Sequence, residues 1–385
     1  MPGRVCMVVH EYFPRDFRVR REARALVAAG YEIDIICLKQ PGQASKELFE
    51  GMNVFRLPIM RHRGSALPVY MAEYMAFAGL AAGLVTAAHI NRPYDVVHVH
   101  APPDFLVTAG VLTRLLSARL ILDIHDLTPE LYGSRFKKTG GAAAQMIMQF
   151  IERGSCAAAD KVITVTEAFK QLLVERGVSP EKVVVLHNCP DPEAFSSKPI
   201  KSKTGQEFVI IHHGTLVHRY GVDILLKAFE KVAAELPQAR LQIYGEGDWL
   251  PRLESRVAQN GLAGRVSLFG EVAQGRVAQA LADADLCVVP NRQDDFTDLL
   301  LPTKLLEALQ MGCPTIASAT RVIAETFPSG VCLVKPGDVD ALAQAISRLA
   351  ENNDERDNLA AAGKLQAKRF EWTTEKHKLL DLYRD

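Results

Sequence analysis

Short runs rich in β-branched and aliphatic residues alternate with helical patterns along the whole chain, and this alternation is what most limits its fold. Strands that alternate with helices form parallel sheets whose two faces are covered by helices. We expect strands in the first half at 5–9, 33–37, 54–57, 96–100, 120–124, 162–165 and 183–186, and in the second half at 209–213, 241–244, 266–269, 286–290, 315–318 and 331–334. The sequence therefore predicts an α/β protein with two Rossmann-like, doubly wound domains.

A length of 385 residues suits two domains of ordinary size better than a single core. The segment 188–206 is rich in Pro, Ser and Lys and has little periodicity, which is typical of a linker. We expect the N-terminal domain to span 1–187 and the C-terminal domain to span 207–368. A last helix is expected within 369–385.

Charge and cysteine usage narrow the classes of function. The 45 basic and 45 acidic residues cancel, so no overall charge attracts nucleic acid. The seven cysteines are scattered, lie mostly inside apolar runs and form no Cys-x-x-Cys pair. They indicate reduced core residues in a cytoplasmic protein. The apolar run after Arg4 is too short for a signal peptide, so we expect no export.

The longest apolar stretch, 67–90, contains Glu73 and several Gly and Ala residues and follows the basic segment 61–63. A membrane-spanning helix has fewer such interruptions. We expect a buried helix of the first domain. The alternative is an amphipathic helix that rests on an anionic membrane surface.

A helix of the second domain begins near Pro302, directly after an acidic loop, and ends before Gly312. Lys304 and Glu307 are three residues apart and share a face of this helix. A cation beside a helix N-terminus attracts phosphate, and a carboxylate nearby accepts hydrogen bonds from sugar hydroxyls. An isolated Lys-x-x-Glu is more often a surface ion pair, so the residues alone leave both interpretations open.

Ligands of open α/β sheets bind at the carboxyl ends of the strands, so residues just after a strand are the functional candidates. The loop from Gly214 to Gly221 follows a strand and opens a helix, and a helix N-terminus beside the Arg219 guanidinium favours a diphosphate. His125 follows another strand, although a lone histidine is more often structural. The acidic loop at 294–298 could hold sugar hydroxyls or simply be solvated.

Together these motifs resemble the family 4, or group 1, retaining glycosyltransferases of the two-domain GT-B fold, of the kind that act in bacterial surface polysaccharide assembly. The matching segments occur in the family's order and span nearly the whole chain: 125–130, 159–166, 213–215, 219–221, 302–314 and 336–338. The resemblance implies a nucleoside-diphosphate sugar donor on the second domain and an acceptor on the first. It also implies that the last helix packs back on the N-terminal domain.

The resemblance assigns roles to single residues. It places His125 against the donor sugar and Glu307 on the ribose, and these two are the catalytic candidates. The other donor-side candidates are Gly214, Thr215, Arg219, Thr303 and Lys304 for the diphosphate, Asp295 and Asp298 for the sugar, and Gly245 and Glu246 near the base. This chain departs from the family at Thr215 and Tyr220, where cations are common, and at Leu299, where the family has a further glutamate that Asp298 or Asp295 could replace.

The first strand-to-helix loop, 10–24, contains five arginines and no glycine. A Rossmann dinucleotide site needs glycines for close approach to pyrophosphate, so this loop argues against a nicotinamide cofactor. Arg15, Arg18 and Asp126 are candidates for the acceptor side, where the arginines could face an acidic, lipid-linked diphosphate sugar. A solvated helix face explains the arginines equally well.

We expect no cofactor and no metal. Asp283-Ala284-Asp285 has the spacing of a metal-binding pair, but it precedes a strand and so lies at the wrong end of the sheet. No His/Cys ligand set for zinc is evident in the sequence.

The sequence thus predicts a metal-independent retaining glycosyltransferase that moves a sugar to a saccharide or lipid-linked acceptor and binds no nucleic acid. We expect it in the cytoplasm, with peripheral contact to the inner membrane face. The alternatives are a nucleotide-sugar epimerase or hydrolase on the same fold, and a nucleotide-sugar-binding protein that has lost catalysis.

Overall fold

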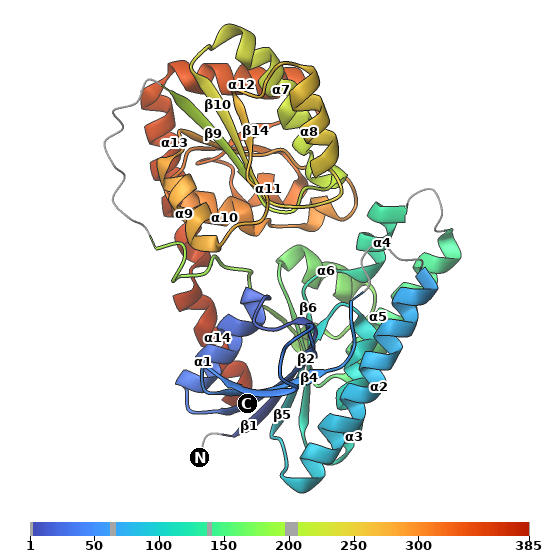
Figure 1. Cartoon of the computed structure of the whole chain (residues 1–385). Coiled ribbons are helices and arrows are strands. Elements are labelled where there is room, and N and C mark those ends of the chain that lie inside the picture. Colours follow the sequence, from blue (N-terminus) through green and yellow to red (C-terminus); the bar gives the residue numbers. More distant parts are fainter. Residues whose placement is uncertain (1–2, 62–66, 137–140, 197–206, 385) are drawn as a thin grey trace. The chain divides into compact units, whose positions relative to one another are not determined.

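The structure is a computed structural model that describes residues 3–61, 67–136, 141–196 and 207–384. The chain forms two compact units (Figure 1). The N-terminal unit comprises Met1–His187 and Glu375–Asp385, and the C-terminal unit comprises Asn188–Thr374. The last segment therefore belongs to the N-terminal unit, although it follows the C-terminal unit in sequence.

The N-terminal unit is built on an eight-stranded sheet with the order β3-β4-β2-β1-β5-β6-β7-β8. All neighbouring strands pair in parallel except β3 and β4. The strands are β1 (Arg4–Tyr12), β2 (Glu32–Leu38), β3 (Lys46–Phe49), β4 (Met52–Leu57), β5 (Val96–Ala101), β6 (Arg119–Ile124), β7 (Lys161–Thr164) and β8 (Val183–Val185). The expected parallel α/β arrangement is confirmed.

The sequence reasoning missed β3. This strand forms a hairpin with β4 through Glu50 and Gly51, whose φ angles of 50° and 81° both lie in the left-handed region. Two such residues make the type I′ turn that suits a two-residue hairpin. The strand is hard to recognise because its side chains are mostly exposed and do not alternate in polarity.

Helices cover both faces of this sheet, and Figure 1 shows α1 and α14 on one side and α2, α3 and α5 on the other. The helices are α1 (Phe17–Ala28), α2 (Leu67–Asn91), α3 (Thr108–Leu115), α4 (Thr128–Phe136), α5 (Ala142–Ala158), α6 (Glu167–Glu175) and α14 (Trp372–Arg384). Local capping defines some of their starts: Asp16 accepts a hydrogen bond from Arg18 N, and Thr166 accepts one from Phe169 N.

The long apolar helix α2 is only partly buried, which corrects the expectation of a buried helix. Phe77, Ala81 and Val85 are completely buried. Other apolar side chains of the same helix point outward, among them Met75 at 59% exposure and Leu80 at 49%. By length and composition alone, Val69–Asn91 is apolar enough to cross a membrane, and 28% of its most apolar stretch is buried.

Helix α14 completes the N-terminal unit from the far end of the chain. Leu379, Leu382 and Tyr383 are buried there. The Tyr383 hydroxyl lies 2.6 Å from His98 Nδ1, and the Tyr31 hydroxyl donates to the Tyr383 carbonyl oxygen. The Glu375 carboxylate accepts a hydrogen bond from His187 N at 2.9 Å.

The C-terminal unit has a six-stranded, fully parallel sheet with the order β11-β10-β9-β12-β13-β14. Its strands are β9 (Phe208–His213), β10 (Ala239–Tyr244), β11 (Val266–Leu268), β12 (Leu286–Val289), β13 (Thr315–Ser318) and β14 (Cys332–Val334). Its helices are α7 (Val222–Glu235), α8 (Leu250–Gln259), α9 (Gln274–Asp283), α10 (Thr303–Gln310), α11 (Arg321–Thr326), α12 (Val339–Glu351) and α13 (Asn353–Ala367).

Two apolar clusters, one on each face, hold this second sheet between its helices. Ile210 of β9 packs with α7, α8 and α12, whereas the next residue, Ile211, packs with α9 and α10. Alternate residues of a strand point to opposite faces, so a strand buried on both sides is continuously apolar. Asp283 is the last residue of α9, and Asp285 lies in the connection to β12, where it accepts a bond from Val209 N.

Six of the seven cysteines are buried.

Candidate functional site

The C-terminal sheet reverses its strand order between β9 and β12. In open parallel sheets, ligands bind at the carboxyl ends of the strands beside such a reversal. The loop after β9 contains the short helix η3 (His218–Tyr220) and leads into α7, and the loop after β12 leads into α10. The predicted diphosphate-binding residues therefore gather at this reversal.

Glycines allow the loops at this edge to approach one another closely. Gly245 has a φ of 136°, and a Cβ atom there would lie 2.0 Å from the Gly214 carbonyl oxygen. At Gly221, with a φ of 66°, a Cβ atom would lie 1.9 Å from the Pro290 carbonyl oxygen. Gly214 N donates to the Tyr244 carbonyl at 2.9 Å. Because these glycines carry no side chains, a ligand can approach the amides of the loops closely.

Lys304, at the start of α10, lies against the first of these glycines. A Cβ atom on Gly214 would be 3.3 Å from Lys304 Nζ. This Nζ is buried, has no hydrogen-bond partner among the described residues, and lies 4.5 Å from the centroid of the Tyr220 ring. Burial lowers the pKa of Lys304 to about 8, against the opposing effect of Cys287 and Glu307. The result is a desolvated cation beside a glycine loop and a helix N-terminus, which is an anion site.

Glu307 lies one turn further along α10 and is 8% exposed. Its Oε2 atom is 3.4 Å from His213 Nδ1, at the end of β9. Burial raises the pKa of Glu307 to about 7, with Lys304 opposing this effect. Burial, together with the charge of Lys304, lowers the pKa of His213 to about 3, so His213 is neutral at physiological pH.

Arg219 is the second cation at this edge. Its guanidinium carbon lies 5.4 Å from the centroid of the Phe296 ring, and its Nη1 atom is buried without a hydrogen bond among the residues that the structure covers. Arg292 fixes the loop, since its backbone N donates to the Arg219 carbonyl at 2.9 Å and its guanidinium bonds to Asp223 at 2.6 Å. Thr303 is half-buried at the start of α10, and Thr215 is exposed.

The acidic loop is held mainly by its own hydrogen bonds. Asp298 accepts bonds from Arg321 N at 3.0 Å and from Gln293 Nε2 at 3.1 Å. Asp294 accepts bonds from the backbone of the following residues. Asp295 is exposed. The roles of Asp295 and Asp298 in sugar binding, and those of Gly245 and the exposed Glu246 near the base, stay predictions.

Two residues at this edge were missed in the sequence. Asn291 lies two residues after the end of β12 and is completely buried. Its two side-chain polar atoms have no hydrogen-bond partner in the described parts of the chain. His213 meets Glu307, as described above. His213 belongs to the matching segment 213–215, but no role was assigned to it there. Asn291 belongs to none of the matching segments, and only its position near a strand end could have identified it.

In the N-terminal unit, His125 lies directly after β6 and is 4% exposed. Its Nε2 atom is 3.4 Å from Asp123 Oδ2 and 3.2 Å from His100 Nδ1. The His100 and His125 rings stack, with centroids 5.4 Å apart. Burial and the charge of Arg18 lower the pKa of His125 to about 3, against the opposing effect of Asp123. The imidazole is therefore neutral and can offer one donor and one acceptor.

The acceptor-side candidates differ in their local contacts and in their exposure to solvent. Arg18 makes two hydrogen bonds to Asp16, at 3.1 Å and 2.9 Å, in the turn that begins α1. Arg20 and Arg24 pair with Glu50 of the β3–β4 turn. Arg15 is exposed and Asp126 is half-buried. The charges of Arg18 and of its partner Asp16 both act on His125, and that of Arg18 has the larger effect.

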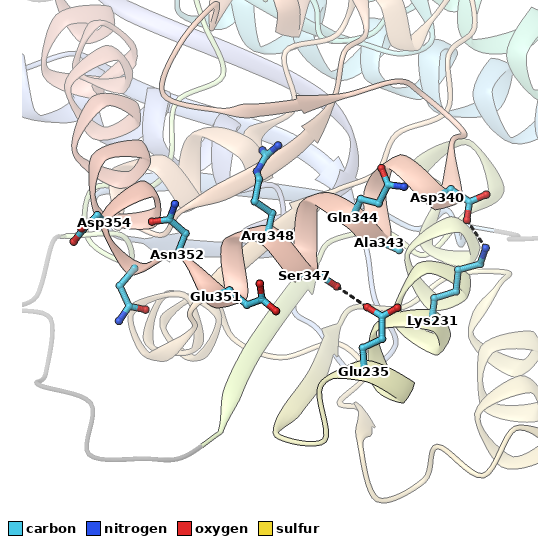
Figure 2. Close-up of a pocket in the computed structure, with 11 residues that line it drawn as sticks. Lys231, Glu235, Asp340, Ala343, Gln344, Ser347, Arg348, Glu351, Asn352 and Asp354 are labelled. Carbon is cyan, nitrogen blue, oxygen red and sulfur yellow. Dashed lines mark hydrogen bonds and ion pairs between the residues drawn. The ribbon is translucent and has the colours of Figure 1, made fainter.

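A groove of about 1030 Å³ lies elsewhere in the C-terminal unit, along α7 and α12 (Figure 2). Its wall is polar, and its charges are partly neutralised within it, because Lys231 pairs with Asp340 and Ser347 bonds to Glu235. It contains none of the predicted site residues and lies on helix surfaces rather than at strand ends. We therefore place the candidate site at the strand ends.

Two family models match the chain. Residues 17–189 match a glycosyl transferase 4-like domain, and residues 207–352 match glycosyl transferases group 1. A phosphatidylinositol N-acetylglucosaminyltransferase subunit from Arabidopsis thaliana is 26% identical over 66% of this chain and 54% of its own length. A putative colanic acid biosynthesis glycosyl transferase, WcaI of Escherichia coli, is 25% identical over 61% of each chain. The chain thus spans little more than half of these relatives.

Solved structures resemble the whole chain. Sucrose-phosphate synthase from Thermosynechococcus elongatus has a TM-score of 0.78, with 20% identity over 99% of this chain and 98% of its own. HepE of Anabaena, in complex with UDP-glucose, has a TM-score of 0.73, with 17% identity over 99% of both chains. At such identities the likeness shows the fold, which is the GT-B fold of glycosyltransferases.

Proposed function

This chain belongs to the group 1 glycosyl transferases, and from that premise we propose that it transfers a sugar from a nucleoside-diphosphate donor to a saccharide or lipid-linked acceptor, with retention at the anomeric carbon. The observation that carries the proposal is Lys304, whose buried, unpartnered Nζ lies against Gly214. A buried ammonium group without a hydrogen bond is costly. A diphosphate bound to the glycine loop would supply hydrogen-bond acceptors and add to the negative charge of Glu307.

The chemistry follows from where charge develops. Cleavage of the sugar–phosphate bond builds negative charge on the departing diphosphate, and Lys304, Arg219 and the amides at the start of α10 stabilise it. Lys304 and Arg219 supply the positive charge that a metal ion would otherwise provide. The proposed reaction therefore uses no metal on the diphosphate and no cofactor. In the same proposal, the leaving phosphate accepts the proton of the attacking hydroxyl on the same face of the sugar, which retains the configuration.

Three side chains position the donor in this scheme. Glu307 accepts hydrogen bonds from the ribose hydroxyls, and its carboxylate is accessible to a ligand only through a small exposed fraction of 8%. His125 presents a neutral imidazole to the donor sugar, where a cation would disfavour the positive charge that develops at the anomeric carbon. Asp298 or Asp295 binds the sugar hydroxyls. HepE holds UDP-glucose, which makes a uridine donor the first to test.

The acceptor is proposed to be lipid-linked, because the N-terminal unit exposes an apolar face. Helix α2 packs against α3, and α3 packs against α5. The large exposed apolar side chains there are Val69, Met71, Met75 and Leu80 of α2, Leu112, Leu115 and Leu116 at α3, and Met146, Ile147 and Phe150 of α5. Large exposed apolar side chains on helices that pack side by side are typical of an interaction site. We propose that it rests on the cytoplasmic face of the inner membrane.

Membrane contact is tested by sedimentation with vesicles of anionic phospholipid. Phe150 is 78% exposed, and the substitution Phe150→Glu together with Met146→Glu should reduce the bound fraction at least several-fold, because a carboxylate resists transfer into the lipid interface. Leu365→Glu is the matched control, since Leu365 is 67% exposed on α13 of the other unit. Equal loss in both variants would contradict a specific membrane face.

The reaction is tested with a donor screen. The purified protein is incubated with UDP-, GDP- and ADP-sugars, with and without a membrane-lipid extract, and released nucleoside diphosphate is measured. Release that requires both one donor and the extract supports the transferase. Release without an acceptor would instead identify a hydrolase or epimerase, and binding of a donor without release under any condition would identify an inactive binding protein.

A further inference from the structure

Folding brings four potential metal ligands together inside the N-terminal unit. His98 and His100 lie two residues apart on β5, so their side chains share one face of the sheet. Asp123 of β6 is the register partner of His100. Glu22 comes from α1, which covers this face. One ligand atom from each of these residues lies within 4.8 Å of the other three.

The four side chains are buried and incompletely paired. Their exposed fractions are 2% for Glu22, 0% for His98, and 1% each for His100 and Asp123. Glu22 Oε2, His98 Nε2, His100 Nε2 and Asp123 Oδ1 have no hydrogen-bond partner among the described residues. Every member of the cluster therefore carries an unpartnered polar atom, although the cost of burying such atoms normally ensures that they are paired.

The charges point to a cation. Two carboxylates face two imidazoles in the interior of a sheet whose neighbouring strands are apolar. Arg18 and Arg21 lie nearby and offset part of the negative charge. Their guanidinium groups nevertheless leave the four atoms named above without a hydrogen bond. A single water molecule can donate two hydrogen bonds and accept two, so it is the competing occupant of this space, and metal content decides between the two.

We propose that Glu22, His98, His100 and Asp123 bind one divalent transition-metal ion, for which Zn²⁺ is the best match. Two imidazoles and two carboxylates are a four-ligand set of the kind that closes a structural zinc site. Imidazole ligands disfavour Mg²⁺ and Ca²⁺, which take oxygen donors. In a tetrahedral zinc site the ligand atoms lie about 3.4 Å apart, given bonds of about 2.1 Å. The four atoms here are close enough to reach that arrangement through small side-chain movements.

The contacts around the cluster are those expected around a metal site. The second ring nitrogen of a ligating histidine is usually hydrogen-bonded, which fixes the nitrogen that faces the metal. His98 Nδ1 lies 2.6 Å from the Tyr383 hydroxyl, and His100 Nδ1 lies 3.2 Å from His125 Nε2. In both histidines the atom without a hydrogen bond is therefore Nε2, and in His98 this atom lies 3.7 Å from Asp123 Oδ2. Tyr383 belongs to α14, so the site also links the last helix to the sheet.

The site lies beside the catalytic candidate of the N-terminal unit and shares no residue with the donor-binding candidates of the C-terminal unit. Asp123 Oδ2 is 3.4 Å from His125 Nε2. A metal that holds Asp123 and His100 in place would also orient the His125 ring. The four ligands would then act as positioning residues for the proposed reaction.

Measuring the metal content tests the proposed metal site without any assay of turnover. The metal-site proposal can therefore fail while the transferase proposal stands. The full chain is produced in medium supplemented with Zn²⁺ or with Co²⁺, dialysed, and analysed by inductively coupled plasma mass spectrometry. We expect about one equivalent of metal and, for Co²⁺, the strong visible absorption of a tetrahedral complex. His98→Gln should lose the metal. His10→Gln should retain it, because His10 is equally buried in the same sheet but pairs with Glu73 instead.

A second variant guards against loss of folding in the first. Tyr383→Phe keeps all four ligands but removes the bond to His98, and it should speed the release of metal to a chelator by about 10- to 100-fold. The proposal is overturned if the wild-type chain contains no stoichiometric metal from either medium. It is also overturned if His98→Gln retains as much metal as the wild type.

Discussion

Lys304 combines two properties that rarely occur together in a side chain kept only for stability. Its ammonium group is buried, and it lacks a hydrogen-bond partner in the described structure. Burial of a charge lowers stability unless a partner compensates it. In the proposed function a bound diphosphate compensates this unfavourable burial, so we expect Lys304 to contribute to binding rather than to stability.

This trade-off gives a prediction for Lys304→Ala. We expect transfer to fall about 10²- to 10³-fold in kcat, the effect of removing one group that stabilises developing charge. The melting temperature should stay the same or rise, because a desolvated charge has been removed. Activity assays and thermal denaturation are compared with those of Lys231→Ala, a lysine that is exposed on α7. A large fall in the melting temperature would show that Lys304 has a structural role instead.

The pKa values at this edge predict a narrow pH dependence. Burial raises the pKa of Glu307 to about 7 and lowers that of Lys304 to about 8. Glu307 is ionised only above its pKa, and Lys304 is protonated only below its own. Donor binding that needs the carboxylate and the ammonium together should therefore be strongest between about pH 7 and pH 8.

Variants separate the two limbs of this profile. Lys304→Arg keeps a positive charge at high pH and should remove the alkaline limb, whereas Glu307→Gln should remove the acid limb and weaken binding throughout. Titration with UDP-glucose by calorimetry at a series of pH values measures both effects. A wild-type profile that is flat from pH 6 to pH 9 would contradict this assignment.

At the scale of elements, the site depends on how closely three loops approach. Gly245 has no room for a side chain, because a Cβ atom would lie 2.0 Å from a backbone oxygen that cannot move away freely. We expect Gly245→Ala to destabilise the C-terminal unit by about 3 kcal/mol or more and to abolish donor binding, since both strain and a clash must be relieved.

A matched control for this prediction is Gly275→Ala. Gly275 lies in α9, and a Cβ atom there would have no neighbour within 4 Å. Alanine should stabilise this helix by up to about 1 kcal/mol. Chemical denaturation of both variants gives the comparison, and the loop argument is wrong if Gly245→Ala is no less stable than the control.

The elements could be predicted well from sequence because their signal is local. Runs of buried β-branched residues identified the strands of both sheets, and helix ends were marked by residues such as Gly312. The hairpin strand β3 was missed because its exposed side chains carry no periodic signal. Helix α2 was expected to be buried because its composition is apolar. Composition alone does not show which face of a helix is covered, so its exposed face was missed.

The candidate site could be predicted only in part, because the sequence signal is local and the site is built from distant segments. Residues directly after strands, such as Gly214 and His125, follow from the rule that ligands bind at strand ends. Glu22, His98 and Asp123 belong to one cluster but are far apart in sequence, so only folding reveals it. Two histidines that alternate along an otherwise apolar strand were the one available sign, because a buried parallel strand has no solvent-facing side to accommodate them.

At the scale of the whole molecule, the N-terminal unit is discontinuous in sequence. Its last helix, α14, contributes buried leucines and the Tyr383 hydroxyl to a unit that is otherwise complete at His187. Removal of one such leucine, Leu379→Ala, should cost about 2 to 5 kcal/mol in the stability of the N-terminal unit, as for other buried leucines. Hydrogen exchange resolved by segment should show the loss in this unit and leave protection in the C-terminal unit unchanged.

The neighbouring His377→Ala serves as the control, because His377 is exposed on the same helix and should change stability by less than about 0.5 kcal/mol. Equal loss of protection in both units after Leu379→Ala would mean that they unfold as one cooperative body.

The discontinuity also sets an order of events during synthesis. A growing chain usually folds its N-terminal domain first, but here the ribosome must make the whole C-terminal unit before it makes α14. The sheet face that α14 covers therefore remains open while residues 188–374 emerge. The C-terminal unit is made later but can be completed first. The nascent N-terminal unit exposes its uncovered sheet face for longer, so we expect chaperones to bind it.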